Sequence, residues 1–324
     1  MAELPLITSE DFDALSPEWA ELFTRVPTVP PFLHPEWHRV WLRHFGRETA
    51  PVFLSFRRDA ELVGVAAFDM HREEARELGD PNVRDYGGPL ALPGEELAIA
   101  SGIMEWLRED LTPGLTFWGL PADAAMTAAV AEAANASGWS LESIAEGTAP
   151  GVGLPADFES FVASLSKHDR HEIRRKLRHL EAAGSVQFET SEEPGDSMGD
   201  LFHLMRISRD DKDEFLTPAM ENFFRDVAQA FSALGMPRLG RLTLDGQLVA
   251  MTMSFESGGT TYLYNSGYDP AHANLAVGLA SKAYAIREAV ARGQTRFDFL
   301  RGNETYKHHL GGIPREIVTL RLRS

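Results

Sequence analysis

The sequence predicts an α/β (α+β) fold made of two similar domains, and three observations support it. Amphipathic helical patterns alternate with short apolar runs typical of strands along the whole chain. Two strand–turn–strand units, residues 51–68 and 238–255, each begin their second strand with Leu-Val and a small residue. A Gly/Pro-rich stretch without periodicity, residues 147–157, is the best linker candidate. We therefore expect a duplicated domain, with the first copy over residues 1–150 and the second over residues 151–324.

Capping residues and apolar spacing predict the elements of the first half. Ser9 is a helix N-cap, and the helix runs to Arg25. Pro35 at the first position and Gly46 just past the end mark a second helix. Apolar runs on both sides of a short charged turn predict a hairpin over residues 51–68. The remaining elements expected in this half are helices over 95–109 and 122–137 and strands over 115–120 and 139–144.

The second half begins with a strongly basic helix, residues 166–184, which Gly184 terminates. Asp245-Gly246 is the strongest short hairpin signal in the chain, and it lies inside a three-stranded meander over residues 238–268. The other elements expected here are helices over 197–210, 217–234, 277–292 and 304–310 and strands over 296–300 and 315–322.

Composition excludes several classes of protein. The chain has 324 residues and no cysteine, which rules out disulfides, thiolate metal sites and a cysteine nucleophile. The net charge of −17 argues against a general nucleic-acid binder. No apolar run is long enough to span a membrane and no signal peptide is evident, so we expect a cytoplasmic protein. No zinc-ligand spacing, Walker loop or nucleophile elbow occurs, so no metal, kinase or hydrolase site is expected.

The charge is concentrated in the first half. Residues 1–150 hold about 10 arginines, no lysine and about 25 acidic residues, whereas residues 151–324 are nearly balanced. Such asymmetry indicates different tasks for the two halves, although drift in a solvated surface explains it equally well. If the acidic half lines an acceptor site, the acceptor should carry an amine or a positive charge.

Residues 260–311 are the most informative stretch of the chain. They read as a strand, an irregular loop, a helix, a strand, a turn and a short helix. The loop ends in small residues at a helix start, where free backbone N–H groups and the helix dipole form a natural anion site. Gly278 would let a phosphate approach closely. Plain packing of a loop onto a helix explains the same residues equally well.

This stretch resembles the GNAT superfamily, and most closely its Fem-like branch, which includes CelD-type acetyltransferases and Fem peptidoglycan aminoacyltransferases. The resemblance covers about 60 residues well, is weaker over the basic helix and LMRISRDDKDEF (204–215), and is loose in the first half, through PFLHPEWHRVWLRHFG and RDYGG. The residues that carry it are Gly267-Tyr268-Asp269-Pro270, Gly278, Asp298-Phe299, Gly302 and Tyr306-Lys307.

The resemblance implies two GNAT-like domains, each a mixed, mostly antiparallel sheet flanked by helices. The first would lie on the acceptor side and the second would hold the acyl donor, with the acceptor in the cleft between them. The implied reaction is transfer of an acyl group from acyl-CoA, most simply acetyl-CoA, to an amine or less often a hydroxyl. The implied acceptor is a small molecule or a cell-envelope precursor. Neither a metal nor a nucleic-acid partner is expected.

The donor-binding residues follow from the same resemblance. The loop departs from the usual Gln/Arg-x-x-Gly-x-Gly/Ala pattern, because it keeps the middle Gly and the final Ala at a displaced spacing. Its backbone would contact the pyrophosphate, and the end of the preceding strand would line the thioester. The residues expected to bind the donor are Asn265, Ser266, Gly267, Val277, Gly278, Leu279 and Ala280.

Three residues are the catalytic candidates. Lys307 matches the family's lysine that supports the transition state electrostatically, or it is a surface lysine on a short helix. Tyr306 would protonate the leaving thiolate, or it packs in the core. Asp298, in an apolar strand, would be a general base or an ion-pair partner of Arg301 or Lys307. Glu304 and the pair His308–His309 are weaker candidates for the base.

The acceptor candidates lie in both halves. Arg209 belongs to the segment that resembles the family's acceptor-contacting arginine, and Asp85 and Tyr86 lie in the RDYGG turn. Asp85 would hold an amine, or it is a local turn cap. The cations of the basic helix would meet a phosphorylated donor or acceptor, or would pair with the acidic tract over residues 189–200.

Two alternatives to an acyl-CoA-dependent acyltransferase stay open. One is an aminoacyl-tRNA-dependent aminoacyltransferase of the Fem type, which the negative charge and the single short basic helix disfavour. The other is a non-catalytic module that binds a small molecule or a protein on the same fold. Side chains filling the space beside Gly278 would favour this last alternative.

Overall fold

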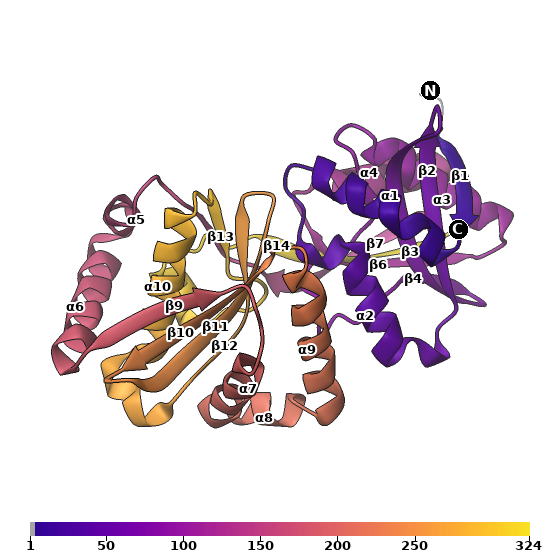
Figure 1. Cartoon of the computed structure of the whole chain (residues 1–324). Coiled ribbons are helices and arrows are strands. Elements are labelled where there is room, and N and C mark those ends of the chain that lie inside the picture. The colour runs from indigo at the N-terminus through magenta and orange to yellow at the C-terminus, as the bar shows by residue number, and fades with distance from the viewer. Residues whose placement is uncertain (1–3) are drawn as a thin grey trace. The chain divides into compact units, whose positions relative to one another are not determined.

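The computed structural model describes residues 4–324, except for the side chains of residues 210–212, and it divides into two compact units (Figure 1). Residues 4–148 and 315–324 form the first unit, and residues 149–314 form the second. Each unit is one sheet flanked by helices, and each sheet is mostly antiparallel. The predicted fold class, two mixed α/β domains, is confirmed.

The first unit is built on an eight-stranded sheet with the order β1-β2-β3-β4-β6-β14-β7, and β5 pairs with β3. Among these strands the pair β4–β6 is parallel. The strands are β1 (Leu6–Glu10), β2 (Pro51–Arg58), β3 (Glu61–His71), β4 (Glu74–Glu77), β5 (Leu90–Ala91), β6 (Gly114–Pro121), β7 (Ser140–Thr148) and β14 (Glu316–Arg323). The helices are α1 (Phe12–Arg25), α2 (Pro35–Phe45), α3 (Glu96–Glu109) and α4 (Ala125–Ser137).

The last strand of the chain belongs to the first unit. β14 lies between β6 and β7 and is antiparallel to both. Residues 315–324 therefore complete the first sheet, whereas the sequence analysis placed them in the second domain. The physical reason is β-pairing between distant segments, which local sequence patterns do not report.

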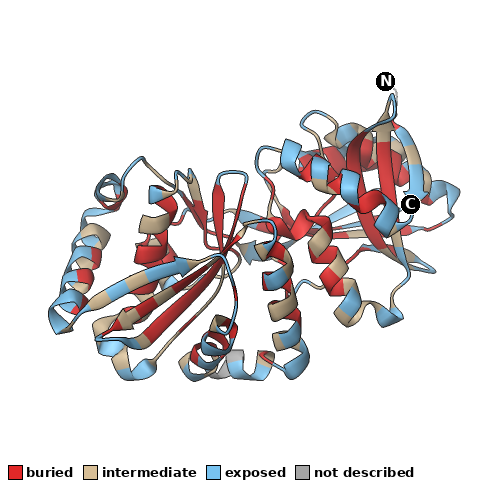
Figure 2. Ribbon diagram, viewed as in Figure 1, coloured by how far each residue is buried: buried red, intermediate tan, exposed pale blue. Residues whose placement is uncertain are grey.

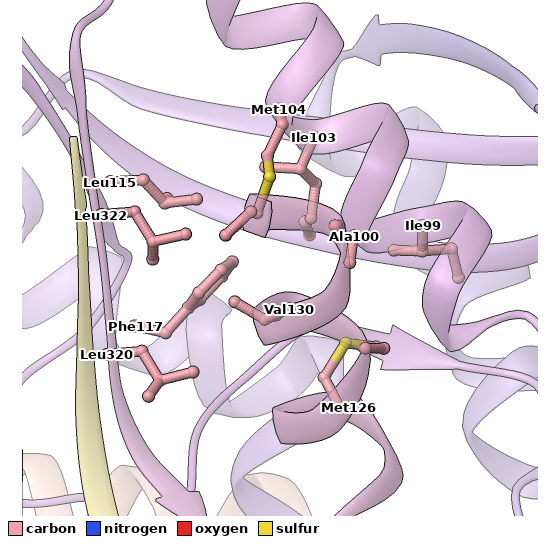
Figure 3. Packing of buried hydrophobic residues seen from close by; sticks show 14 of the residues in the cluster. Ile99, Ala100, Ile103, Met104, Leu115, Phe117, Met126, Val130, Leu320 and Leu322 are labelled. Atoms are coloured by element: carbon pink, nitrogen blue, oxygen red, sulfur yellow. The ribbon is translucent and has the colours of Figure 1, made fainter. Parts of the chain in front are cut away.

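The core of the first unit lies between the sheet and α3 and α4 (Figure 3). Ile99 and Ile103 of α3, Val130 of α4, Phe117 of β6 and Leu320 of β14 belong to this cluster, and all five are buried. Buried stretches run along the strands of both sheets (Figure 2). Full burial of each such side chain stabilises the fold by roughly 1.5–3 kcal/mol. Leu320 thus ties the C-terminal strand to the unit by packing as well as by pairing.

The second unit contains a six-stranded sheet with the order β8-β13-β12-β11-β10-β9, in which the pair β12–β13 is parallel. The strands are β8 (Gly151–Gly153), β9 (Val186–Ser191), β10 (Pro237–Leu244), β11 (Gln247–Ser257), β12 (Thr260–Tyr268) and β13 (Arg296–Asp298). The helices are α5 (Phe158–Ser164), α6 (Lys167–Ala183), α7 (Ser197–Ser208), α8 (Asp210–Phe215), α9 (Pro218–Ser232), α10 (Val277–Ala291) and α11 (Thr305–His309).

Helices cover both faces of the second sheet (Figure 1). α10 packs on one face in a buried cluster that also includes α5 and α6. On the other face, α7 and α9 contact the strands, for example through the rings of Phe231 and Phe255, whose centroids lie 5.3 Å apart. The central helix α10 is mostly buried, which places its first turn firmly against the sheet.

The two units repeat one arrangement of elements. In each, a third antiparallel strand is followed by a helix and by a further strand that is parallel to that third strand: β4, α3 and β6 in the first unit, with the two-residue β5 between β4 and α3, and β12, α10 and β13 in the second. The parallel register begins at Ala75↔Leu115 in the first unit and at Thr260↔Arg296 in the second. The duplication that the sequence echo indicated is present in this element order.

Most predicted elements lie within a few residues of the observed ones, but short edge elements were missed. The first helix begins at Phe12 with Asp11 as its N-cap, because residues 6–10 form β1 instead of a helical turn after Ser9. β9 and α5 were not predicted, since each is too short to show a clear period. Across residues 4–324, no helix is both long and apolar enough to cross a membrane.

Candidate active site

The parallel strands of the second unit separate and leave room for a pocket. Their register ends at Tyr262↔Asp298, whereas β12 continues to Tyr268, paired there with β11 alone. A bulge at Tyr264 bends β12 where the two strands part. A pocket of about 270 Å³ lies at this end of β12, with Ser266 and Tyr268 in its wall.

The first turn of α10 forms another wall of this pocket. Ala276 precedes the helix in the left-handed conformation (φ 55°), and no described side chain caps the helix N-terminus. The first N–H groups of a helix have no partner within it, and the dipole places partial positive charge there. Val277, Gly278 and Leu279 line the pocket, so this turn suits an anionic group of a ligand.

Gly278 is needed for packing as well as for access. A Cβ atom on this residue would lie 2.9 Å from Cδ1 of Tyr268. The ring of Tyr268 therefore occupies the direction in which a larger residue would point. The close approach of a phosphate, expected from the sequence, is one reason for a glycine here, and its packing against Tyr268 is a second.

Lys282 is a pocket residue that the sequence analysis did not single out. It is 6% exposed, and its Nζ donates to the carbonyl oxygen of Gly278 at 2.9 Å. The same ammonium lies 4.8 Å from the centroid of the Tyr306 ring. The chain has only five lysines, and two of them, Lys282 and Lys307, are buried here. The scarcity of lysine in the chain is the sequence signal that could have identified Lys282.

Tyr306 comes from α11 and lines the pocket. Burial and the carboxylate of Glu304 raise the pKa of its phenol, against a smaller lowering by Arg209. Its ring meets Phe299 edge to face, with centroids 6.2 Å apart. The phenol therefore keeps its proton at neutral pH and can act as a hydrogen-bond donor or a general acid.

Lys307 forms hydrogen bonds to the loop that precedes α11, residues 300–302. Its Nζ donates to the carbonyl oxygens of Leu300 at 3.0 Å, Arg301 at 2.7 Å and Gly302 at 3.4 Å, and it lies 2.9 Å from Oε2 of Glu304. It is 2% exposed and is not among the described residues that line the pocket. This geometry fits a residue that positions the loop, whereas the sequence analysis expected a charge facing the reacting carbonyl.

Asp298 also faces the loop. Its Oδ1 accepts from the backbone N–H of Leu300 at 2.9 Å, and its Oδ2 lies 3.5 Å from Nη2 of Arg296. The Asp298 side chain is buried, and it is not part of the described pocket wall. Leu300 adopts a left-handed conformation (φ 57°), which this hydrogen bond stabilises. Of the two roles expected for Asp298, the geometry favours a structural one.

Glu304 supplies a carboxylate to the pocket. Burial would raise its pKa, but the ammonium of Lys307 and, more weakly, the guanidinium of Arg209 hold that pKa below its usual range. Its Oε1 lies 3.7 Å from Nη1 of Arg209, which also lines the pocket. The carboxylate is therefore ionised at neutral pH, which suits binding of a cationic group better than proton abstraction.

The other residues expected to bind the acyl donor lie on β12 and α10, and they do not all face the pocket. Ser266 lines the pocket, whereas Gly267 faces α7, because a Cβ there would lie 2.4 Å from the backbone of Leu204. Ala280 is buried in the core cluster under α10. Asn265 is partly exposed on β12 and lies outside the described pocket wall. The structure thus brings Ser266, but not its two neighbours, to the pocket.

The residues of the first unit that are expected to bind the acyl acceptor, Asp85 and Tyr86, directly follow Arg84, which forms a buried ion pair with Glu77. Glu77 and Arg84 are both almost fully buried, and Glu77 Oε1 also accepts from the N–H of Gly88 at 2.6 Å. Tyr86 is 4% exposed and packs in the core, with its ring centroid 6.5 Å from that of Phe32, so little of its surface is accessible to a substrate. Asp85 is half-buried in the same turn.

In the first unit the corresponding position, where the parallel strands separate, is filled by a side chain. The parallel register of this unit ends at Arg76↔Thr116, and directly beyond it the carboxylate of Glu77 accepts from the N–H of Trp118 at 3.3 Å. A side chain therefore satisfies backbone donors where the strands part. The pocket nearby holds only about 10 Å³, roughly the space of one water molecule.

The basic helix α6 does not pair with the acidic tract among the described ion pairs. Glu192 and Asp200 of that tract lie 3.4 Å and 2.7 Å from the guanidinium groups of Arg238 and Arg241 on β10. Of the two interpretations given for the basic helix, pairing with the acidic tract is therefore wrong, because the described ion pairs of the tract are with β10. At its first turn α6 reaches α11, because Asp169 lies 2.6 Å from Nδ1 of His309.

These groups define what the pocket can do chemically. A helix N-terminus and the cations Arg209 and Lys282 favour an anion, the carboxylate of Glu304 favours a cation, and the phenol of Tyr306 can supply a proton. In the part of the chain that the structure describes, no three His, Asp or Glu side chains gather as metal ligands.

Comparisons with known proteins give a family model for the second unit and solved structures of similar fold. Residues 167–308 match the family model of the acetyltransferase (GNAT) domain. No curated protein matches the sequence significantly. The crystal structure of FemX is similar with a TM-score of 0.71 at 12% identity, over 97% of this chain and 96% of FemX.

Two further solved structures share the architecture. One is the C-terminal domain of a putative lysylphosphatidylglycerol synthetase from Agrobacterium fabrum, with a TM-score of 0.61 at 10% identity, over 97% of this chain and 92% of that one. The other is a tandem GNAT protein from the clavulanic acid biosynthesis pathway, with a TM-score of 0.50 at 16% identity, over 98% and 97% of the chains. At these identities the likeness shows the fold.

Proposed function

We propose that this chain, which has the Fem-like tandem-domain fold of the GNAT superfamily, transfers an acyl group from acyl-CoA to an amine. The observation that carries the proposal is the separation of β12 from β13 beyond Tyr262↔Asp298. It opens a pocket that the first turn of α10 and the phenol of Tyr306 both line. The simplest donor is acetyl-CoA.

The pocket suits the donor's charge. A diphosphate would accept hydrogen bonds from the N–H groups of Val277 and Gly278 at the N-terminus of α10. Arg209 and Lys282 supply positive charge to the same pocket. The bend of β12 exposes its edge beyond Leu263, where backbone N–H groups would bind the thioester carbonyl and stabilise the oxyanion.

The pocket also suits the chemistry of the transfer. The amine attacks the thioester carbonyl, the C–N bond forms, and the C–S bond breaks. Tyr306, whose raised pKa keeps it protonated, would give its proton to the leaving thiolate. Glu304, ionised beside Lys307, would hold the amine of the acceptor as it enters.

Lys307 and Asp298 would act as positioning residues in this scheme. Lys307 holds the carbonyl groups of residues 300–302, and Asp298 holds the N–H of Leu300. Together they fix the turn that presents Glu304 and Tyr306 to the pocket. Their loss would disturb the site without removing a group that touches the substrate.

Calorimetry with acetyl-CoA tests the donor site. Ala273 lines the pocket and is exposed, so Ala273→Glu adds a carboxylate that would repel a diphosphate. Ala271 is exposed in the same segment and is not part of the described pocket wall, so Ala271→Glu is the matched control. We expect one site in the natural chain and in the control, and binding weakened at least tenfold in Ala273→Glu. Equal affinities in the two variants would contradict the assignment.

An aminoacyl-tRNA is the second candidate donor, and helix α6 is the observation that favours it. Lys167, Arg174, Arg175 and Arg178 are exposed on this helix, whose first turn contacts α11 beside the pocket. Retention of tRNA on a filter, lost steeply as salt rises, would support this donor. A binding module without catalysis is less favoured: the ring of Tyr268 lies against Gly278, but a pocket of about 270 Å³ stays open along the same turn.

A further inference from the structure

The ammonium of Lys282 occupies an unfavourable position for a cation. Lysine side chains in helices extend toward the N-terminus, and its hydrogen bond to Gly278 brings the charge back to the first turn of α10. This is the positive end of the helix dipole, where a cation is disfavoured. The side chain is also 6% exposed, so most of its hydration is lost. A placement with these two costs points to a role in the site.

The contacts of this ammonium connect it to the phenol of the pocket. Nζ lies 2.9 Å from the carbonyl oxygen of Gly278 and 4.8 Å from the centroid of the Tyr306 ring. A cation over an aromatic face is attracted to the ring and fixes its orientation. Both side chains line the same pocket.

Three charged groups face Tyr306 from the elements around it. Glu304, at the start of α11, opposes ionisation of the phenol, and Arg209, at the end of α7, favours it. Lys282 approaches from α10. Burial raises the pKa of the phenol, so proton transfer to a thiolate becomes favourable only if positive charge stabilises the phenolate.

We propose that Lys282 is a positioning residue of the acyl transfer, whose ammonium fixes the ring of Tyr306 and stabilises the phenolate left by proton transfer. In this step the C–S bond breaks, its electron pair stays on sulfur, and the O–H proton of Tyr306 moves to the thiolate. The proton that the amine nitrogen loses on forming the amide returns to the phenolate through solvent. The inference rests on the proposed function.

The test measures ionisation of Tyr306 without any substrate. Tyr306 is replaced in the full chain by 3,5-difluorotyrosine, whose phenol titrates at lower pH, within the range where proteins stay folded. The ¹⁹F resonance is followed against pH in the otherwise natural chain and in Lys282→Met, Lys282→Arg and Lys167→Met. Lys167 is exposed at the start of α6, so its variant controls for the loss of one lysine charge.

The expected result is a titration midpoint about one pH unit higher in Lys282→Met than in the natural chain. Lys282→Arg should keep the natural midpoint, because it restores the charge, and so should Lys167→Met. Coincident midpoints in the natural chain and Lys282→Met would overturn the inference. If circular dichroism shows Lys282→Met to be unfolded, Lys282→Gln, which retains a polar end, replaces it in the comparison.

A kinetic arm separates this role from general support of the fold. With acetyl-CoA and an amine acceptor, kcat of Lys282→Met should fall at least tenfold, and Lys282→Arg should recover most of it. A loss that Arg does not restore would contradict the role of the charge. Failure of acetyl-CoA to bind would overturn the proposed function. The fluorine titration needs no substrate, so it would still decide whether Lys282 stabilises the phenolate of Tyr306.

Discussion

Oε2 of Glu304 lies 2.9 Å from Nζ of Lys307, and the two charges fill the space in which Gly302 would carry a side chain. A Cβ at Gly302 would lie 2.4 Å from that oxygen and 2.9 Å from that nitrogen. The glycine, the lysine and the glutamate of the Gly-x-x-x-Tyr-Lys segment are therefore one steric and electrostatic unit. Tyr306 reaches the pocket from the same segment.

Gly302→Ala should destabilise the second unit. The residue has φ 123°, and its added Cβ would displace the Glu304–Lys307 pair. We expect the free energy of unfolding to fall by about 2–3 kcal/mol in urea titrations. Gly293→Ala is the matched control, because it also has a positive φ (78°) but nothing within 4 Å of the added Cβ. Its loss should be about 1 kcal/mol, and equal losses would show that the clash is unimportant.

Lys307→Met should loosen the loop over residues 300–302. Its ammonium binds three carbonyl oxygens and one carboxylate, and a methionine of similar length replaces none of these bonds. The expected loss of unfolding free energy is about 2–3 kcal/mol. The rate of acyl transfer should fall with it, and the Kd for acetyl-CoA should change little. A Lys307→Met variant as stable as the natural chain would disprove the positioning role.

Sequence patterns predicted the fold better than the site. The βαβ order and the Gly-x-x-x-Tyr-Lys segment are local, so the second unit and the place of Tyr306 could be predicted. Lys307 and Asp298 were assigned to chemistry because residue type does not reveal direction, and both side chains face the loop. Local patterns do not identify Lys282 as a site residue, because its burial and its contact with Tyr306 of α11 are not visible in them.

Tyr306→Phe should separate proton donation from binding. The variant keeps the ring under Lys282 and beside Phe299 and removes only the hydroxyl. We expect kcat to fall by roughly 10²-fold, with an unchanged Kd for acetyl-CoA in calorimetry. Tyr284→Phe is the control, because its hydroxyl bonds to Glu181 outside the described pocket wall. Similar rates for both variants would remove Tyr306 from the mechanism.

His34 should make the first unit sensitive to acid. Burial lowers its pKa from 6.5 to about 4, so between these values the unfolded chain binds a proton that the folded chain does not. The stability is therefore present above pH 6.5 and is lost as pH falls toward 4, by about 3 kcal/mol for this group.

The variant His34→Asn keeps a side chain that can cap α2 through the N–H of Glu36. Its unfolding free energy should fall less between pH 7 and pH 4 than that of the natural chain. The buried His38, whose pKa is also lowered by burial, keeps part of the dependence in both proteins. Identical pH profiles would show that His34 is not buried as a neutral ring.

Hydrogen–deuterium exchange with and without acetyl-CoA can locate the donor site in the second unit without an acceptor. We expect acetyl-CoA to slow exchange in peptides that cover residues 263–268 and 276–282, where β12 separates from β13 and α10 begins. Peptides from residues 4–148 should be unchanged, since Glu77 already occupies the corresponding donors of the first unit. Unchanged exchange at the start of α10, or protection confined to the first unit, would show that the donor does not bind at this pocket.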